Sequence, residues 1–282
     1  MANPRRSEAA DAAAVDDAAD VGTALYVYGV VPKDTPPDVF ADVGGVDPAH
    51  PVVLAFGDEA AAITSEVALR EFGTDAVEAN LRNPDWLREK VVAHEHVLNA
   101  ALAGATSVVP FRFGAIYDDE AHVHRLLADR SDFPELLARF AGTHEWGVKA
   151  FLDREGFRER LARQRGLADA DASGGREYML RRQLERELDD AAVAFAADCA
   201  DAAHARLEAV ALEGRTNPAQ RAQDDEPDVM FLNAAYLLRR DEDDRFEAEL
   251  ASLQREYEPD GVRFERTGPW APYNFVDGQE PA

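Results

Sequence analysis

A long stretch of helical periodicity, between Leu180 and Val210, restricts the possible folds more than any other feature of the sequence. Apolar residues recur there every three or four positions over about eight turns of 3.6 residues each. The residues of this stripe are Leu180, Leu184, Leu188, Ala192, Phe195, Cys199, Ala203, Leu207 and Val210. We therefore expect one long helix that packs its stripe against a sheet.

Apolar runs bounded by turn residues predict strands on both sides of this helix. The expected strands are 24–31, 52–56, 61–65, 106–109, 144–152, 229–238 and 262–266. Gly57 and Asp58 separate the second and third runs, which is typical of a hairpin. These strands are too many and too widely spaced along the chain for an all-helical fold.

Capping residues predict further helices. Asn83 before a proline marks a helix start, and Gly104 marks its end. Two more helices are expected after the acidic pair 118–119 and from Asp132, and an amphipathic one at 241–257. Helices that alternate with strands and cover one face of a sheet favour an α+β fold with ferredoxin-like layers.

The chain of 282 residues is long enough for two modest domains. We expect an N-terminal α+β domain at 22–142 and a C-terminal ferredoxin-like α+β domain with an aromatic tail at 143–282. Residues 1–21 are rich in Ala and Asp with few large apolar groups, so we expect a disordered acidic tail. Long connections are predicted at 166–175 and 216–227.

Acidic residues dominate the charge of the chain. It has 55 Asp and Glu against 30 Lys and Arg, a formal net charge of -25. Molar salt shortens the Debye length to about 3 Å and screens such self-repulsion, which indicates a halophilic protein. A partner-binding acidic surface is the alternative, but the acidity is spread along the whole chain. Nucleic acid is excluded as a partner, because neither predicted domain is net basic.

Neither the cysteine nor the hydropathy pattern indicates export or a membrane. Cys199 is the only cysteine, so no internal disulfide can form. The N-terminus lacks the continuous apolar core of a signal peptide, and no stretch approaches 18 uninterrupted apolar residues. We expect a soluble cytoplasmic protein.

No residue pattern predicts a catalytic, cofactor or metal site. His94 and His96 are two apart on a helix and point about 200° around its axis from each other, so they cannot share one ion. His122 and His124 are also two apart on a predicted helix, so they cannot share one metal ion either. His94 lies on an apolar stripe, which favours a buried structural role, and Cys199 is expected to be a buried, inert thiol. Phosphate-binding and nucleophile-elbow motifs are absent from the sequence.

Two segments combine aromatic and turn residues in a way that a plain core does not need. The first is 111–114, and the second is 267–276, which contains two prolines. The second segment either folds back as a plug for the core or the domain junction, or presents binding anchors. The candidate protein-interaction residues of the two segments are Phe111, Arg112, Phe113, Trp270, Tyr273 and Phe275.

These segments and four others resemble the GvpL/GvpF family of gas vesicle proteins. The similar segments, in order, are 25–30, 109–117, 145–149, 175–182, 233–238 and 268–275. The last is similar to the family's closing GPWPPY[SN]F pattern, with Ala271 in place of the first of the paired prolines. The acidic N-terminus, the length and the acidity resemble a haloarchaeal GvpL more than the shorter F member.

The resemblance implies a cytoplasmic accessory protein, either free or associated with the gas vesicle, with two ferredoxin-like α+β domains. Its expected partners are the small hydrophobic shell subunit of the GvpA type and other accessory proteins during nucleation or early formation of this buoyancy organelle. No catalytic residues carry over from the family. A small-ligand sensor or an enzyme on a ferredoxin-like fold is the alternative. A structural shell component is a third possibility, which the acidity disfavours.

Overall fold

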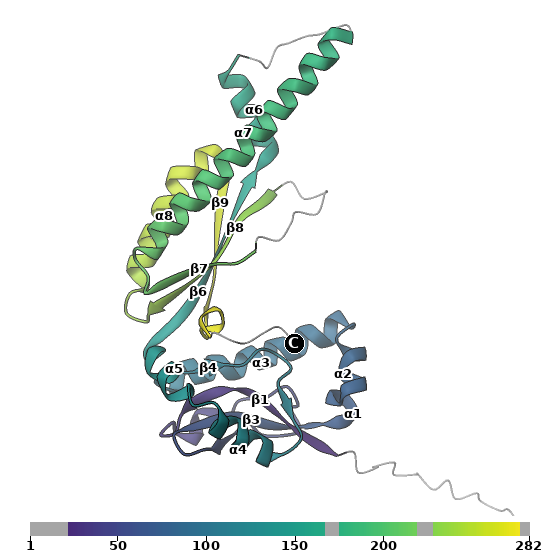
Figure 1. The fold of residues 1–282 in the computed structure, drawn as a ribbon, viewed down its shortest axis with the longest axis vertical. Coiled ribbons are helices and arrows are strands. Elements are labelled where there is room, and N and C mark those ends of the chain that lie inside the picture. Colours follow the sequence, from purple (N-terminus) through teal and green to yellow (C-terminus); the bar gives the residue numbers. More distant parts are fainter. Residues whose placement is uncertain (1–21, 167–174, 219–227, 277–282) are drawn as a thin grey trace, which may run out of the picture.

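The computed structural model describes residues 22–166, 175–218 and 228–276 (Figure 1). The acidic tail predicted at 1–21 lies outside these ranges, as do most residues of the two long predicted connections. The described residues form two separate antiparallel sheets with helices packed on them. This confirms a mixed α and β fold.

The first sheet has five strands in the order β2-β3-β1-β4, with β5 also paired to β1. Its strands are β1 (Thr23–Pro32), β2 (Val53–Phe56), β3 (Ala60–Ala68), β4 (Val109–Pro110) and β5 (Ile116–Tyr117). Its helices are η1 (Pro37–Phe40), α1 (Leu69–Phe72), α2 (Thr74–Asn80), α3 (Pro84–Gly104), α4 (Glu120–Asp129) and α5 (Phe133–Arg139).

The second sheet has four strands in the order β7-β8-β6-β9. Its strands are β6 (Thr143–Asp153), β7 (Glu213–Thr216), β8 (Asp228–Arg239) and β9 (Val262–Trp270). Its helices are α6 (Arg154–Gln164), α7 (Gly175–Glu208), α8 (Asp243–Tyr257), η2 (Glu258–Asp260) and η3 (Tyr273–Phe275). Helices α7 and α8 lie side by side along this sheet in Figure 1.

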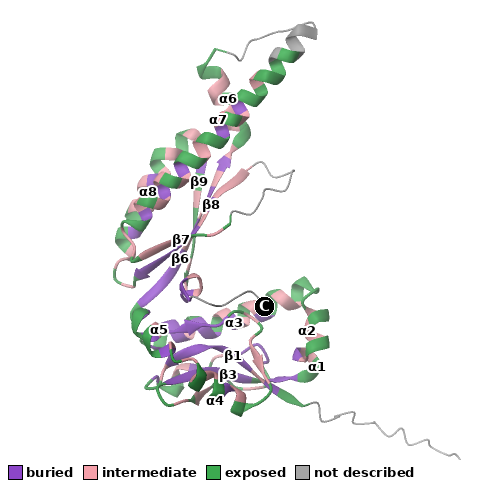
Figure 2. Cartoon of the chain, viewed as in Figure 1, coloured by how far each residue is buried: buried purple, intermediate pink, exposed green. Residues whose placement is uncertain are grey.

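Both faces of the first sheet are buried, because side chains of β1 point alternately to each. Tyr26 and Tyr28 pack with Leu98 of α3 on one face. Val27 packs on the other face with Phe133 of α5. Figure 2 shows the buried colour along most of β1 and β3, the central strands of this sheet. The helices predicted from Asn83 and from the acidic pair before α4 are therefore confirmed and cover opposite faces.

Two of the predicted caps form, whereas the Asp132 side chain binds Arg130 and makes no capping hydrogen bond at the start of α5. The Asn83 side chain accepts hydrogen bonds from the backbone N–H groups of Asp85 and Trp86 at the start of α3. Asp119 accepts from His122 N–H at the start of α4. These bonds satisfy amides that have no partner within the helix.

The long helix is confirmed, and its apolar stripe lies against the second sheet. The buried members of the stripe are Leu188, Ala192, Cys199, Ala203 and Leu207. The helix ends at Glu208, so Val210 lies just past it. Phe246 and Leu253 of α8 complete the same core.

Cys199 is expected to be unreactive in the folded protein. Its side chain is 1% exposed, and burial raises the pKa of the thiol to about 12. Since the thiolate is the reacting form, a water-soluble maleimide should label the native protein only as fast as it unfolds. Labelling measured with and without denaturant checks this, and fast labelling of the native protein would contradict the packing of α7.

Three strand predictions were wrong in extent, and one of them is β3, which runs from Ala60 to Ala68 where 61–65 was predicted. The strand predicted at 106–109 is only Val109–Pro110, because β4 pairs with just two residues of β1. At one of them, Gly29, a Cβ atom would lie 2.7 Å from the Val109 carbonyl oxygen, so only glycine permits this approach. The final strand continues beyond the predicted end at 266 to Trp270, because it pairs with β6 as far as Glu145.

Candidate functional site

The closing segment, residues 271–276, leaves β9 and lies between the two sheets, where Figure 1 shows the short η3 turn. Ala271, Phe275 and Val276 are buried, and Tyr273 and Asn274 are half-buried. The segment belongs to cores on both faces of the first sheet. It is therefore an integral part of the fold at the junction of the sheets.

Phe275 is the apolar anchor of the closing segment. Its side chain is fully buried in a cluster that contains Val27 and Val30 of β1 together with Leu237 of β8. The Arg215 guanidinium carbon lies 5.3 Å from the centre of its ring. The cluster around Phe275 thus contains apolar residues of both sheets.

Tyr273 completes a chain of buried hydrogen bonds with α3 and β1. Its hydroxyl donates to Glu95 Oε1 at 2.8 Å and lies 3.0 Å from His94 Nε2. His94 Nδ1 is 2.9 Å from the Tyr26 hydroxyl, which accepts from the Gly114 N–H at 3.0 Å. The Phe111 carbonyl, 3.2 Å from Nε2, can only accept, so the neutral imidazole carries its proton on Nε2 and its Nδ1 accepts from the Tyr26 hydroxyl.

Burial favours the uncharged forms of the groups in this chain. It lowers the pKa of His94 to about 4, although the Phe111 carbonyl 3.2 Å from Nε2 acts in the opposite direction. It also raises the pKa of Glu95 and of Tyr273. Glu95 Oε2 is buried and has no hydrogen-bond partner among the described residues. The buried structural role predicted for His94 is confirmed.

Asn274 binds a second buried carboxyl group, that of Glu145 on β6. Its backbone N–H donates to Glu145 Oε2 at 2.9 Å, and its Nδ2 donates to Oε1 at 2.6 Å. Desolvation outweighs these hydrogen bonds and raises the pKa of Glu145 to about 7. The carboxyl group therefore changes its charge near neutral pH, inside the junction.

Two arginines hold the backbone of the closing segment. Arg139 of α5 donates to the Phe275 carbonyl at 3.2 Å, and Arg215 of β7 donates to the Asn274 carbonyl at 2.9 Å. Both arginines also bind Glu213, at 2.5 and 2.8 Å. The closing segment is thus fixed from α3, α5, β6 and β7.

The six residues predicted as interaction candidates lie in different environments. Phe111 is 8% exposed, and Phe275 is fully buried. Phe113 is half-buried with its ring centre 6.3 Å from that of Trp86. Arg112 is exposed, and Trp270 and Tyr273 are half-buried. Only part of the predicted set is therefore on the surface.

Trp270 lines a groove between α3 and the second sheet, which we call the Trp270 groove. The groove has a volume of about 450 Å³. Its lining residues are Asn99, Leu102, Ala103, His144, Arg240, Gly268, Pro269 and Trp270. An aromatic ring beside apolar and cationic side chains suits a protein contact.

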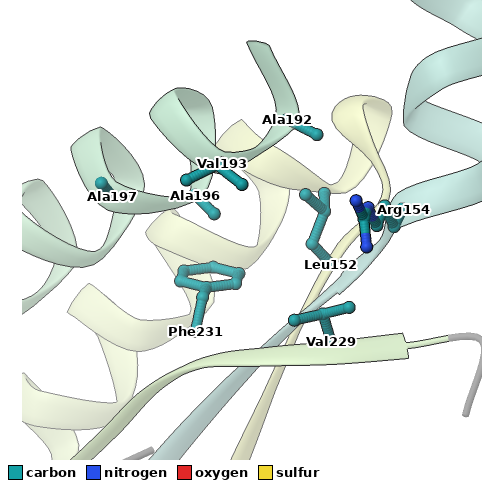
Figure 3. Close-up of a pocket in the computed structure, with 8 residues that line it drawn as sticks. All are labelled: Leu152, Arg154, Ala192, Val193, Ala196, Ala197, Val229 and Phe231. Atoms are coloured by element: carbon teal, nitrogen blue, oxygen red, sulfur yellow. The ribbon is translucent and has the colours of Figure 1, made fainter. Parts of the chain in front are cut away.

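A second hollow lies between α7 and the start of β8 (Figure 3). It has a volume of about 280 Å³ and is lined almost entirely by aliphatic and aromatic side chains, such as Val193 and Phe231. Arg154 at its edge is bound to Asp189 at 3.0 Å. Polar groups do not converge there as a specific small-molecule site requires.

The described residues contain no group of three or more His, Cys, Asp or Glu side chains placed to hold a metal ion. Within the same residues, every helix is too short or too polar to span a bilayer. The pairs formed by His122 with Asp119 and by His124 with Glu120 are exposed contacts within α4.

Sequence reasoning missed the polar partners of the closing segment. Glu95, Glu145 and Arg215 were not predicted as site residues, because acidic and arginine residues are common throughout the chain. One signal was present: Glu145 interrupts the run predicted as a buried strand at 144–152, where an ionised side chain needs a partner.

The chain matches known gas vesicle proteins over nearly its whole described length. The family model described as "Gas vesicle synthesis protein GvpL/GvpF" matches residues 24–277. Gas vesicle protein L of Streptomyces sp. is 34% identical, with 89% of this chain and 92% of that protein covered. Gas vesicle protein L1 of Halobacterium salinarum is 24% identical, with 98% of each chain covered.

A solved structure shares the fold. The crystal structure of the gas vesicle protein GvpF from Anabaena sp. superposes with a TM-score of 0.66 at 22% identity, covering 90% of this chain and 96% of that one. The family model also covers most of the closing segment, and the Streptomyces protein is 34% identical to this chain. The similarity therefore extends to the sequence as well as the fold. The chain therefore belongs to the GvpL/GvpF family of gas vesicle synthesis proteins.

Proposed function

We propose that this protein is a non-catalytic, cytoplasmic accessory protein of gas vesicle assembly. It binds the hydrophobic shell subunit of the GvpA type and other accessory gas vesicle proteins during nucleation or early formation. The observation that carries this proposal is the family match from residue 24 to 277, which includes both sheets and the closing segment. The haloarchaeal relatives and the net charge of -25 support a halophilic setting.

A physical requirement of assembly supports this role. Shell subunits expose apolar surface before they polymerise, and a soluble partner that covers this surface prevents unproductive association. The hollow beside Val193 is apolar, and the Trp270 groove combines an aromatic ring and apolar side chains with His144 and Arg240, on an otherwise acidic chain. Trp270 is the best placed of the predicted anchors, because it is half-buried and held by β9 pairing.

We also infer that residues 22–142 and 143–282 are separate α+β domains. The chain order β6-α6-α7-β7-β8-α8-β9, with the spatial order β7-β8-β6-β9, supports ferredoxin-like layering for the second domain, with α6 as an addition before the crossing helix α7. The closing segment then joins the two domains through a shared apolar cluster.

Replacing Trp270 with Ala should weaken binding of the purified shell subunit about tenfold or more, because central aromatic anchors dominate interface energies. Binding is measured by biolayer interferometry in molar salt with the shell subunit presented in detergent. Phe56→Ala is the matched control, since this aromatic is 44% exposed on β2, away from the groove. Its affinity should stay at the level of the parent protein.

Circular dichroism decides how the Trp270→Ala result is interpreted. If the Trp270→Ala variant is folded and binds the shell subunit with full affinity, Trp270 is not part of the contact surface. If the variant is unfolded, the Trp270 ring is part of the core instead.

A further inference from the structure

Helix α6 is cationic in a strongly acidic chain. It carries four arginines against two glutamates, whereas the whole chain has 55 acidic and 30 basic residues. Its first residue, Arg154, lies at the edge of the apolar hollow between α7 and the start of β8 (Figure 3). The fold thus brings a cation to an apolar surface at this place.

Arg154 is the one charged side chain among the described residues that line this hollow. It is 44% exposed, and Figure 3 shows its guanidinium nitrogens beside Leu152. Its Nη2 lies 3.0 Å from Asp189 Oδ1, and the same oxygen lies 3.3 Å from Arg158 Nε. One carboxylate therefore serves two guanidinium groups, which leaves an excess of positive charge at the edge of the hollow.

The pairing with Asp189 leaves hydrogen-bonding capacity on Arg154. Asp189 Oδ1 is buried and has no hydrogen-bond partner among the described residues, so neither ion pair has hydrogen-bond geometry. The exposed carboxylates of α7 on either side, Asp190 and Asp198, are not among the residues that line the hollow. Arg154 can therefore donate to an acceptor that a bound molecule brings.

The rest of the hollow is apolar and accessible from outside. Leu152 and Phe231 line it from the sheet, and Ala192 and Ala196 line it from α7. Val193 beside them is 64% exposed. The volume of about 280 Å³ is small for a whole ligand, since small-molecule pockets span about 300–1,000 Å³. Aliphatic side chains of another protein suit it better.

We propose that this hollow and Arg154 form a docking site for an acidic amphipathic segment of a partner protein. An aliphatic side chain of the segment enters the hollow beside Val193, and an aspartate or glutamate next to it binds the Arg154 guanidinium. Both contacts persist in molar salt. Partly buried ion pairs are screened much less than exposed ones, and apolar burial does not depend on charge.

This inference rests on the proposed function and deepens it, because it states the chemistry that one assembly partner presents. The hollow shares no lining residue with the Trp270 groove. The two surfaces can therefore be tested separately, since variants of the hollow leave Trp270 unchanged.

The test is the fluorescence anisotropy of two labelled peptides titrated with the full chain in molar salt. Both peptides are amphipathic with leucines on one face; the first has glutamates beside the leucines, and the second has glutamines in their place. We expect the glutamate peptide to bind about tenfold more tightly, because the glutamine peptide lacks the charge-assisted hydrogen bond to Arg154. Equal binding of the two peptides, or binding of neither, would overturn the proposal.

Two pairs of variants connect the binding to this place. Val193→Asp should weaken binding of the glutamate peptide about tenfold, because it removes an apolar contact and supplies a competing carboxylate. Val92→Asp, at a valine of α3 that is 63% exposed, should leave the affinity unchanged. Arg154→Gln should remove the preference for glutamate. Arg88→Gln, at an exposed arginine 3.5 Å from Asp85, should retain it.

Other occupants of the hollow give different results. A parent protein that dimerises in sedimentation velocity, and is monomeric as Val193→Asp, would place a second copy there and overturn the assignment to another protein. Displacement of the peptide by dodecanoate at a lower concentration than by unlabelled peptide would assign the hollow to a fatty acid and overturn it too. An unchanged preference in a folded Arg154→Gln variant would also contradict it. None of these results bears on shell-subunit binding at Trp270.

Discussion

Replacing Phe275 with Ala is expected to lower the free energy of unfolding by about 3–5 kcal/mol. The ring is fully buried in a cluster that contains residues of both sheets, so its loss leaves a cavity at the junction of the sheets. Neighbouring side chains cannot close this cavity easily, because β1 and β8 are each held by strand pairing. Urea denaturation in molar salt measures the change.

Phe113→Ala is the matched control for that experiment. This ring is only half-buried at the edge of the first core, so its loss should cost clearly less. A loss below about 1 kcal/mol for Phe275→Ala would contradict the docked closing segment. A loss of stability that small would mean that the closing segment is not packed into the core, and the segment would then be available to bind a partner.

Stability should fall as the pH rises from about 4.5 to about 7, through the titration of Glu145. The folded-state pKa of this carboxyl group is about 7, above its usual 4.5. Its contribution to stability is therefore complete below pH 4.5 and is lost as the pH rises through 7. A shift of this size corresponds to a change on the order of 3 kcal/mol.

Glu145→Gln isolates this contribution from those of the other carboxyl groups. The glutamine oxygen can accept from the Asn274 backbone N–H, and the Asn274 amide can turn to accept from the glutamine. We expect the variant to gain stability relative to the parent protein between pH 5 and about 8, as the parent carboxyl ionises. Denaturation at a series of pH values measures the difference. A constant difference would show that Glu145 titrates normally and is accessible to water.

Local signals in the sequence predicted most of the secondary structure. The caps at Asn83 and Asp119 and the stripe of α7 depend on neighbours within a few residues, so a sequence pattern reveals them. The short helices α1 and α2 and the short strand β7 were missed, because each contains too few residues to show a period. Their form depends on the sheets beside them.

The closing segment was harder to predict, because its contacts are distant in sequence. Tyr273 meets His94 across 179 positions, and Asn274 meets Glu145 across 129. Sequence reasoning could recognise the aromatic residues and left open whether they plug the core or bind a partner. The structure places Phe275 in the core, and it leaves Trp270 in a groove, where a binding role stays a prediction.

The central claim is that this protein contacts the gas vesicle shell subunit and its accessory partners. An affinity pull-down of the tagged full chain in molar salt, from cells that form gas vesicles, tests it most directly when the captured chains are identified by mass spectrometry. We expect the shell subunit or other accessory gas vesicle proteins to be enriched with the parent protein and depleted with Trp270→Ala. Recovery of neither, with the tagged protein folded, would contradict an assembly role and favour a small-ligand sensor or an enzyme.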